Sequence, residues 1–294
     1  MGAGETAEDR PGTVGPPPQR PSNDDVGQIP YDFRGETTPL RMERCGGRDQ
    51  VVRQIEAQGW RSYEAPLPVV LSRLIARRAS VFLDVGANTG FYSLVAAVAG
   101  AAQVRAFEPI PFIADLFTRN VAHTFPGGRA SIQLFRQAVA ERAGQAEIFM
   151  PDQGHGLIET SASLNAGFRA SHSDVLTVPL TTLDQHLEDL PLPPGHRLVI
   201  KIDVESCEEQ VLAGARDTIT NHRPLIVLEI LPGADLNFYQ RFLQEQGYAH
   251  HALLPPNQLT AMATIQANLR NRDHLLVPTE LSVEDLMGEP ATAS

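Results

Sequence analysis

Residues 82–94 read FLDVGANTGFYSL, and the pattern of this stretch changes twice. A short apolar run holds Asp84 and ends at Val85, and a turn with two closely spaced glycines, Gly86 and Gly90, follows it. An apolar run with helical spacing comes next. A buried strand, a glycine turn and a helix in that order are typical of nucleotide-binding α/β folds. Because glycine lacks a Cβ, the backbone of this turn can bend tightly and approach a ligand closely.

Strand and helix patterns alternate on both sides of this stretch. Apolar runs predict strands over residues 81–85, 103–109, 131–140, 197–204 and 224–230, and near 248–254 and 274–278. Helical spacing predicts helices within 50–77 and over 91–99, 111–120, 207–220 and 236–246. We therefore expect a doubly wound, mostly parallel α/β sheet with helices on both faces.

Residues 138–180 interrupt this alternation. Their pattern predicts a hairpin around Gly144 and a strand over 174–180, separated by the polar, glycine-rich segment 154–168. A loop of that length is often functional. We expect a short hairpin and loop insertion here.

The two ends of the chain differ from its middle. Residues 1–40 contain seven prolines and six glycines and few large apolar residues. We expect a disordered tail over 1–47, a folded domain over 48–280 that includes the helices of 50–77, and a flexible C-terminus over 281–294.

Composition argues against several classes of partner. The net charge of −11, with only 24 basic residues, disfavours binding to a nucleic-acid backbone. No apolar run reaches the ~18 residues of a membrane helix, and the N-terminus lacks the pattern of a secretory signal. The two cysteines form no disulfide framework or zinc motif, so the cytoplasm is the expected location.

A second acidic residue, Glu108, ends the strand that follows the glycine turn. A carboxylate there can accept both hydrogen bonds of a ribose diol, each contributing about 1.5–3 kcal/mol. The G-x-G-x-x-G fingerprint of dinucleotide sites and the G-x-x-x-x-G-K-[ST] phosphate loop are both absent. The pattern therefore favours S-adenosylmethionine, which has no phosphate and carries an ammonium and a sulfonium group. The alternative is that Asp84 and Asn88 only brace the turn.

The stretch VIKIDVESCEEQVLAGA, residues 199–215, places Asp203 and Glu205 at the end of another buried strand. If this strand lies beside the first one, Asp203 reaches the cofactor. Ser206 and Glu209 have the spacing of a capping box at the next helix. Lys201, the only lysine, is expected to pair with Asp84 or Glu229, or else to extend its amine to solvent.

Several of these stretches occur together, in order, in one family of enzymes. FLDVGANTGFYSL, VRAFEPIP with Asn120 further on, QAVAERAGQAEIF, TTLDQHL, the 199–215 stretch and PLIVLEI resemble the FkbM-type methyltransferases over roughly residues 80–230. The resemblance implies a class I S-adenosylmethionine-dependent fold that methylates hydroxyl oxygens of natural products, sugars or lipids. It implies cofactor contacts at these residues: Asp84, Gly86, Asn88, Gly90 and Glu108. We add Ala138, from QAVAERAGQAEIF. Ser206 departs from the family, which usually has glycine there.

Methylation of a hydroxyl requires a base that accepts its proton. Asp203 and Glu205 are the candidate catalytic residues, and His155 or His172 is the second choice. Asp203 could instead contact the cofactor or cap the helix that follows. Asp203 and Glu205 with a third oxygen ligand would suit a Mg²⁺ ion, but no metal is expected.

Other polar residues receive more ordinary interpretations. Ser161, Ser163 and Asn165 either contact the acceptor or belong to an ordinary polar connection. His186, His222, His250 and His251 are expected on surface helices or turns.

We thus expect an O-methyltransferase whose partner is a small-molecule hydroxyl acceptor, with no nucleic acid and no membrane span. The alternatives are a nicotinamide-dependent oxidoreductase and a non-catalytic cofactor-binding protein. The sequence does not specify the acceptor or the oligomeric state.

Overall fold

The computed structural model describes residues 23–77, 81–128, 131–151, 157–158, 163–165, 172–188, 190, 192, 195–255, 258–267, 269 and 272–287. Its central sheet is built from these strands: β3 (Val81–Val85), β4 (Gln103–Phe107), β5 (Ile132–Phe135), β9 (Leu198–Ile202), β10 (Leu225–Glu229), β11 (Tyr248–Leu254), β12 (Gln258–Ala261) and β13 (Asp273–Pro278). The helices are α1 (Gln50–Gln58), α2 (Leu67–Arg77), α3 (Phe91–Ala99), α4 (Pro111–Thr124), α5 (Leu183–Leu187), α6 (Glu208–Ala213), α7 (Arg216–His222), α8 (Leu236–Gln246) and α9 (Val283–Met287).

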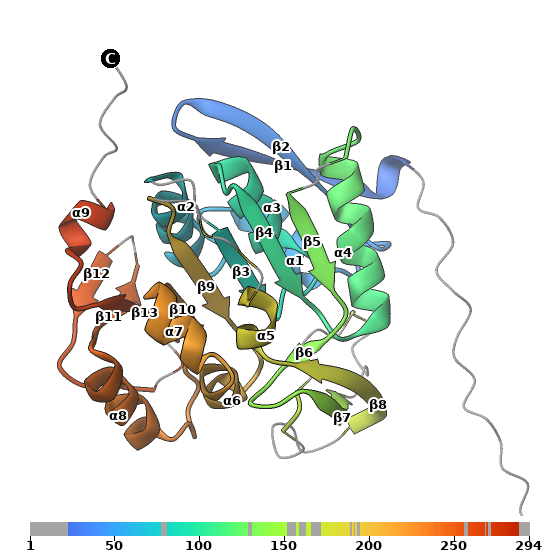
Figure 1. The fold of residues 1–294 in the computed structure, drawn as a ribbon. Coiled ribbons are helices and arrows are strands. Elements are labelled where there is room, and N and C mark those ends of the chain that lie inside the picture. Colours follow the sequence, from blue (N-terminus) through green and yellow to red (C-terminus); the bar gives the residue numbers. More distant parts are fainter. Residues whose placement is uncertain are drawn as a thin grey trace, which may run out of the picture.

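The sheet has the order β12-β11-β13-β10-β9-β3-β4-β5 (Figure 1). The five strands from β10 to β5 are mutually parallel, and β13 inserts antiparallel between β10 and β11. The order of the strands reverses between β3 and β9, and ligands of such sheets bind at the carboxyl ends of the strands beside this point. The expected mostly parallel α/β fold of class I type is confirmed.

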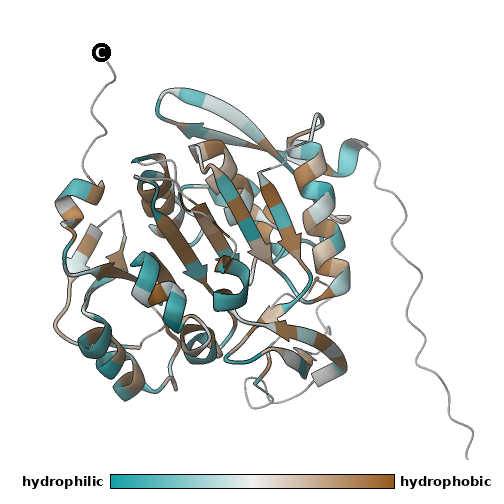
Figure 2. Ribbon diagram, viewed as in Figure 1, coloured by the Kyte–Doolittle hydropathy of each residue, from teal (hydrophilic) through white to brown (hydrophobic). Residues whose placement is uncertain are grey.

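Helices cover both faces of the sheet because successive strand residues point to opposite sides. Val199 packs on one face with α1, α2 and α3, whereas Ile200 packs on the other with α6, α7 and α8. Figure 2 shows the resulting pattern, with apolar strands inside and polar outer faces on the helices. The helices expected within 50–77 and over 91–99 are present, and Gly100 ends α3 in a left-handed conformation.

An antiparallel hairpin, β1 (Val26–Phe33) and β2 (Glu36–Glu43), precedes α1 and follows the short 3₁₀ turn Asn23–Asp25. Ile29, Tyr31, Leu40 and Met42 are at most 2% exposed and join the core formed with α1 to α3. The expectation of disorder over 1–47 is therefore wrong for residues 26–43. The prolines and glycines hid a period-two apolar pattern, and proline is tolerated in edge strands such as these. Residues 1–22 lie outside the described residues.

The C-terminal end also differs from the expectation of a flexible segment over 281–294. Leu286 of α9 is 6% exposed and packs into the same core as the hairpin. Residues 288–294 lie outside the described part of the chain.

The insertion forms a three-stranded sheet of β6 (Ala138–Val139), β8 (His172–Thr181) and β7 (Gly144–Pro151), in that order. The expected hairpin around Gly144 is wrong, because β6 and β7 pair with opposite sides of β8 and not with each other. The strand expected over 131–140 is split between this sheet and the central one. Of segment 154–168, residues 157–158 and 163–165 are described.

The helix expected over 207–220 is divided into α6 and α7. The division lies at Gly214, where an added Cβ would be 2.1 Å from the carbonyl oxygen of Ala140. Within the described residues, no helix is both long and apolar enough to span a membrane.

Candidate functional site

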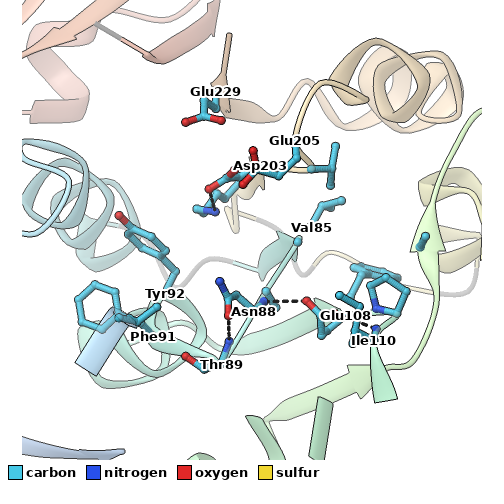
Figure 3. Close-up of a pocket in the computed structure, with 18 of the residues that line it drawn as sticks. Val85, Asn88, Thr89, Phe91, Tyr92, Glu108, Ile110, Asp203, Glu205 and Glu229 are labelled. Atoms are coloured by element: carbon cyan, nitrogen blue, oxygen red, sulfur yellow. Dashed lines mark hydrogen bonds and ion pairs between the residues drawn. The ribbon is translucent and has the colours of Figure 1, made fainter. Parts of the chain in front are cut away.

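A pocket of about 300 Å³ opens at the carboxyl ends of β3, β4, β9 and β10. Six expected site residues line it: Gly86, Asn88, Glu108, Ala138, Asp203 and Glu205. Figure 3 shows Glu108 on one side of the pocket and Asp203, Glu205 and Glu229 on another. The two strand tips that the sequence singled out therefore converge on one cavity. Asp84 and Gly90 are not among the lining residues.

Gly86 allows the carboxyl ends of β3 and β9 to lie in contact. The Asp203 amide donates to the Val85 carbonyl oxygen at 3.1 Å. A Cβ added at Gly86 would lie 1.9 Å from the Asp203 carbonyl oxygen, and the φ of Gly86 is +80°. Both the left-handed backbone and the close approach require glycine here.

The rest of the turn is fixed by hydrogen bonds and close packing within the protein. Asn88 has a left-handed φ of 51°, and its amide donates to Oε2 of Glu108 at 3.0 Å. Its side-chain Oδ1 accepts from the Thr89 amide at 2.7 Å. Gly90, with φ +99°, packs against the Phe117 ring of α4, to which an added Cβ would come within 2.8 Å. Gly90 thus shapes the turn from outside the cavity.

Glu108 is 5% exposed, and both of its carboxylate oxygens are already positioned. Oε1 accepts from the Ile110 amide at 2.9 Å and Oε2 from the Asn88 amide. Burial raises the pKa of Glu108 to about 7, although the two backbone donors oppose this shift. Each carboxylate oxygen has a second lone-pair direction, so Glu108 can still accept hydrogen bonds from a ligand.

Lys201 and Asp203 form an ion pair on the pocket wall, with 3.0 Å between Nζ and Oδ2. Lys201 makes its ion pair with Asp203 and not with Asp84 or Glu229, the two expected partners; Asp84 is its neighbour across the strands and interacts with it electrostatically, whereas Glu229 does not pair with it. Burial alone would lower the pKa of Lys201, but the carboxylates around it raise the pKa above its ordinary value. The amine also lies 4.8 Å from the centre of the Tyr92 ring.

Asp84 is fully buried beside this pair and not on the pocket wall. Its Oδ2 accepts from the Ser93 hydroxyl at 2.6 Å. Burial raises the pKa of Asp84, and Lys201 opposes the rise.

Glu205 and Ser206 occupy a strained turn, with φ values of 54° and 73°. The hydroxyl of Ser163 donates to the Glu205 carbonyl oxygen at 2.6 Å, and Oε1 of Glu208 accepts from the Val204 amide at 3.0 Å. Ser163 is thus engaged with the protein and is 2% exposed, whereas its neighbour Leu164 lines the pocket.

The expected capping box of Ser206 and Glu209 is wrong. Ser206 has a left-handed backbone and is exposed, and the N-cap of α6 is Cys207, which makes no side-chain cap hydrogen bond. Glu209 instead accepts from the Asp235 amide at 2.9 Å.

The pocket also contains charged residues that sequence reasoning missed. Glu229 and Arg272 pair at 2.9 Å, and Glu64 accepts from the Tyr92 hydroxyl at 2.7 Å. Burial and the nearby Asp203 raise the pKa of Glu229 to about 9. Glu229 ends β10 as Asp203 follows β9, a signal that could have identified it. No local pattern marks Glu64, which precedes the family motifs.

The histidines do not join this site. His250 and His251 are buried in β11, not on the surface as expected, and Nε2 of His250 lies 2.8 Å from Nδ1 of His274. Neither His155 nor the side chain of His172 is among the parts that the structure describes. Across the described residues, no group of three or more His, Cys, Asp or Glu side chains is arranged to hold a metal ion.

Solved structures of methyltransferases are similar to this chain in fold, at low sequence identity. An FkbM methyltransferase from Methylobacillus flagellatus is 15% identical with a TM-score of 0.45, over 67% of this chain and 43% of that chain. An S-adenosylmethionine-dependent methyltransferase from Agrobacterium tumefaciens is 12% identical with a TM-score of 0.42, over 88% of this chain and 76% of that chain. The chain thus spans less than half the length of the first protein. No curated protein matches it.

Comparison with protein families gives a match to the methyltransferase FkbM domain over residues 84–249. The matched region includes the glycine turn, Glu108 and the Asp203 turn. It takes in 166 of the 294 residues, and the chain therefore belongs to the FkbM methyltransferase domain family.

Proposed function

We propose that this protein transfers a methyl group from S-adenosylmethionine to a hydroxyl oxygen of a small molecule. The observation that carries the proposal is the convergence of Glu108 and Asp203 on one pocket. The glycine turn lies beside them, and its Gly86 leaves no room for a Cβ. Enzymes of the FkbM family are S-adenosylmethionine-dependent, and the acceptor and its atom are the new parts of the proposal.

The residues present fit this cofactor. Glu108 would accept from the ribose diol, the backbone of Gly86 to Asn88 would contact the adenosine, and Ala138 would lie along the same wall. The pocket volume of about 300 Å³ lies in the range of small-molecule sites. Acidic side chains outnumber basic ones on the lining, and a bound ammonium or sulfonium group would favour their ionised form. When bound, the cofactor supplies a methyl group activated by a positively charged sulfur.

The protein's own contribution is to orient the acceptor and remove its proton. We assign Asp203 as the proton acceptor: Lys201 holds its Oδ2, and its Oδ1 would accept from the hydroxyl. Glu205 is the second candidate on the same turn. Orientation of two reactants contributes up to about 7–11 kcal/mol, and a positioned base contributes about 10²–10⁴-fold in rate.

The proposal also covers the cellular location of the protein and the bounds of its folded domain. The free thiols of Cys45 and Cys207 support a reducing, cytoplasmic location. We also propose that the folded domain starts at the β1–β2 hairpin and extends to α9, since both ends pack into one core.

The first test is a screen of hydroxylated metabolites with methyl-labelled S-adenosylmethionine. We expect label on an oxygen of the product, identified by mass spectrometry and NMR. Label only on nitrogen or carbon would contradict O-methylation. Thermal stabilisation by a nicotinamide dinucleotide, but not by S-adenosylhomocysteine, would favour the oxidoreductase alternative.

The variant Glu108→Ala tests the cofactor assignment. Loss of two charge-assisted hydrogen bonds should weaken S-adenosylhomocysteine binding by about tenfold or more, measured by calorimetry. Glu141→Ala, which removes an exposed carboxylate outside the pocket, is the control. Equal affinity of Glu108→Ala and the wild type would exclude the ribose assignment.

The variant Asp203→Asn tests the proton acceptor. It keeps the shape of the side chain, so turnover should fall by about 10²–10⁴-fold while S-adenosylhomocysteine affinity changes little. If Glu205→Gln shows this loss and Asp203→Asn does not, the base is Glu205. Full turnover in both variants would reject a carboxylate base on this turn.

A further inference from the structure

The glycine turn is held from behind by one side chain of α4. Asn120 is fully buried, and its Nδ2 donates to the Thr89 carbonyl oxygen at 2.8 Å. Its Oδ1 accepts from the Glu43 amide at the end of β2, also at 2.8 Å. A single carboxamide therefore connects the pocket turn to the N-terminal hairpin, which lies outside the region matched by the family.

The same helix binds the hairpin at further points. Oε1 of Glu43 accepts from Arg119 at 2.9 Å and lies 3.0 Å from Nε2 of His123. One turn later, Oγ1 of Thr124 accepts from the Arg41 amide at 2.9 Å and donates to the Arg41 carbonyl at 3.1 Å. Thr124 thus makes the same kind of contact with β2 as Asn120 but no contact with the glycine turn. Figure 1 shows the β1–β2 hairpin next to the C-terminal half of α4, beside the central strands.

The contact matters because the turn departs from regular backbone geometry. Asn88 has a left-handed φ of 51°, a conformation that asparagine tolerates better than most non-glycine residues, and the hydrogen bonds around it select this conformation over the extended and helical ones. The amide of Asn88 orients Glu108, and the carbonyl that Asn120 holds belongs to the next residue. Loss of the Asn120 bond would leave a buried carbonyl unpaired and free the turn to relax.

We propose that Asn120 is a positioning residue of the cofactor pocket, which fixes the Thr89 carbonyl and so makes the β1–β2 hairpin part of the support of the glycine turn. The proposal rests on the proposed function, because the pocket is assigned to S-adenosylmethionine. Asn120 acts through the turn and touches no ligand itself.

The variant Asn120→Asp separates the two bonds. The introduced carboxylate still accepts from the Glu43 amide but places an oxygen against the Thr89 carbonyl. At pH 8, we expect S-adenosylhomocysteine affinity to fall by about tenfold or more, because a buried carbonyl loses its donor. The matched control Thr124→Val loses contacts with the same strand, and its affinity should stay within about twofold of the wild type.

The pH dependence of the affinity distinguishes a lost hydrogen bond from a general destabilisation of the fold. Protonation of the introduced carboxyl restores a donor to Thr89, so the ratio of wild-type to variant affinity should narrow from pH 8 to pH 6. The titratable and charged side chains around this position are Glu43 of β2, Arg119 and His123 of α4, and Asp49 before α1, which interacts with Thr89 and Glu43. Thr124→Val carries the same groups without the new carboxyl, so a narrowing seen in Asn120→Asp and absent from Thr124→Val belongs to the introduced carboxyl.

Hydrogen exchange provides a test that needs no ligand. Amides of residues 86–90 should exchange faster in Asn120→Asp than in Thr124→Val or the wild type. If Asn120→Asp does not fold, Asn120→Ala, which buries no charge, should show the same loss of affinity and protection. Wild-type affinity and protection in either Asn120 variant, or equal losses in Thr124→Val, would overturn the proposal. Failure of the wild type to bind S-adenosylhomocysteine would overturn the proposed function instead, and the exchange experiment would still decide the role of Asn120.

Discussion

Ser206 adopts a backbone conformation that serine disfavours, directly after the candidate base Glu205. Its φ is 73°, and its side chain is exposed. Ser206→Gly should therefore raise the free energy of unfolding by about 1 kcal/mol, measured by urea titration. Ser62→Gly, at an exposed serine outside the left-handed region, is the control and should be neutral or destabilising. A loss of stability in Ser206→Gly would show that the serine makes a contact that offsets its strain.

Gly86 is needed for two separate reasons, and a matched glycine separates them. Gly86 and Gly35 have φ values of +80° and +81°, but a Cβ would clash with Asp203 only at Gly86. Gly35→Ala should lower the free energy of unfolding by about 1–2 kcal/mol, through the left-handed conformation alone. Gly86→Ala should lower it further by about 1–3 kcal/mol, measured by urea titration, and should abolish S-adenosylhomocysteine binding. Equal effects of the two variants would contradict the close packing of the strand tips.

At the scale of elements, the β1–β2 hairpin packs into the core, and loss of its core contacts should lower the free energy of unfolding. Leu40 is fully buried against the core of α1 to α3. Leu40→Ala should lower the free energy of unfolding by about 2–5 kcal/mol in urea titration. Phe112→Ala, at an aromatic residue that is 40% exposed, should change it much less. A loss below about 0.5 kcal/mol for Leu40→Ala would restore the interpretation of this segment as a loose tail.

Elements with a strong local pattern were predictable from the sequence. Residues 81–85 and 91–99 form a strand and a helix with the expected bounds, because the apolar run and the glycines on either side define them locally. The insertion was not predictable, since β6 and β7 depend on β8, which lies more than 20 residues beyond β7. The break between α6 and α7 likewise depends on a distant contact, that of Gly214 with Ala140.

The same division applies to the site. Glu108 and Asp203 were found because each ends or follows a buried strand, and parallel strands bring their carboxyl ends to one edge. Glu64 and Arg272 lie in irregular segments on either side of the family region, and only the tertiary structure brings them to the pocket. The role of Ser163 was hidden for another reason, because its partner is a backbone carbonyl that carries no sequence signal.

Over the whole molecule, many carboxyl groups keep their protons to unusually high pH. Burial is the main cause, and it raises the pKa to about 6 for Asp49, to about 7 for Glu108, Glu208 and Asp273, and to about 9 for Glu229. In the unfolded chain such groups have pKa values near 4. Between about pH 5 and 9 the folded protein therefore binds more protons through these groups than the unfolded chain does. The free energy of unfolding falls as the pH rises through this range.

This proton balance predicts a melting temperature that falls from pH 7 to pH 9, measured by calorimetry. His250 and His274 have pKa values lowered by burial to about 4 and 3, so they act in the opposite direction only below about pH 6.5. Glu229→Gln should flatten the fall between pH 7.5 and 9, where Glu229 titrates. A melting temperature that rises over this range in the wild type would contradict the buried, protonated carboxyls.

The pocket wall holds the only lysine among these 294 residues, and that lysine is 3% exposed. Reagents that acylate lysine, and endoproteases specific for it, therefore have no accessible lysine side chain to attack while the native state persists. The rate of acylation or cleavage at Lys201 therefore reports how often this wall of the pocket opens, and a ligand that stabilises the closed pocket should lower that rate.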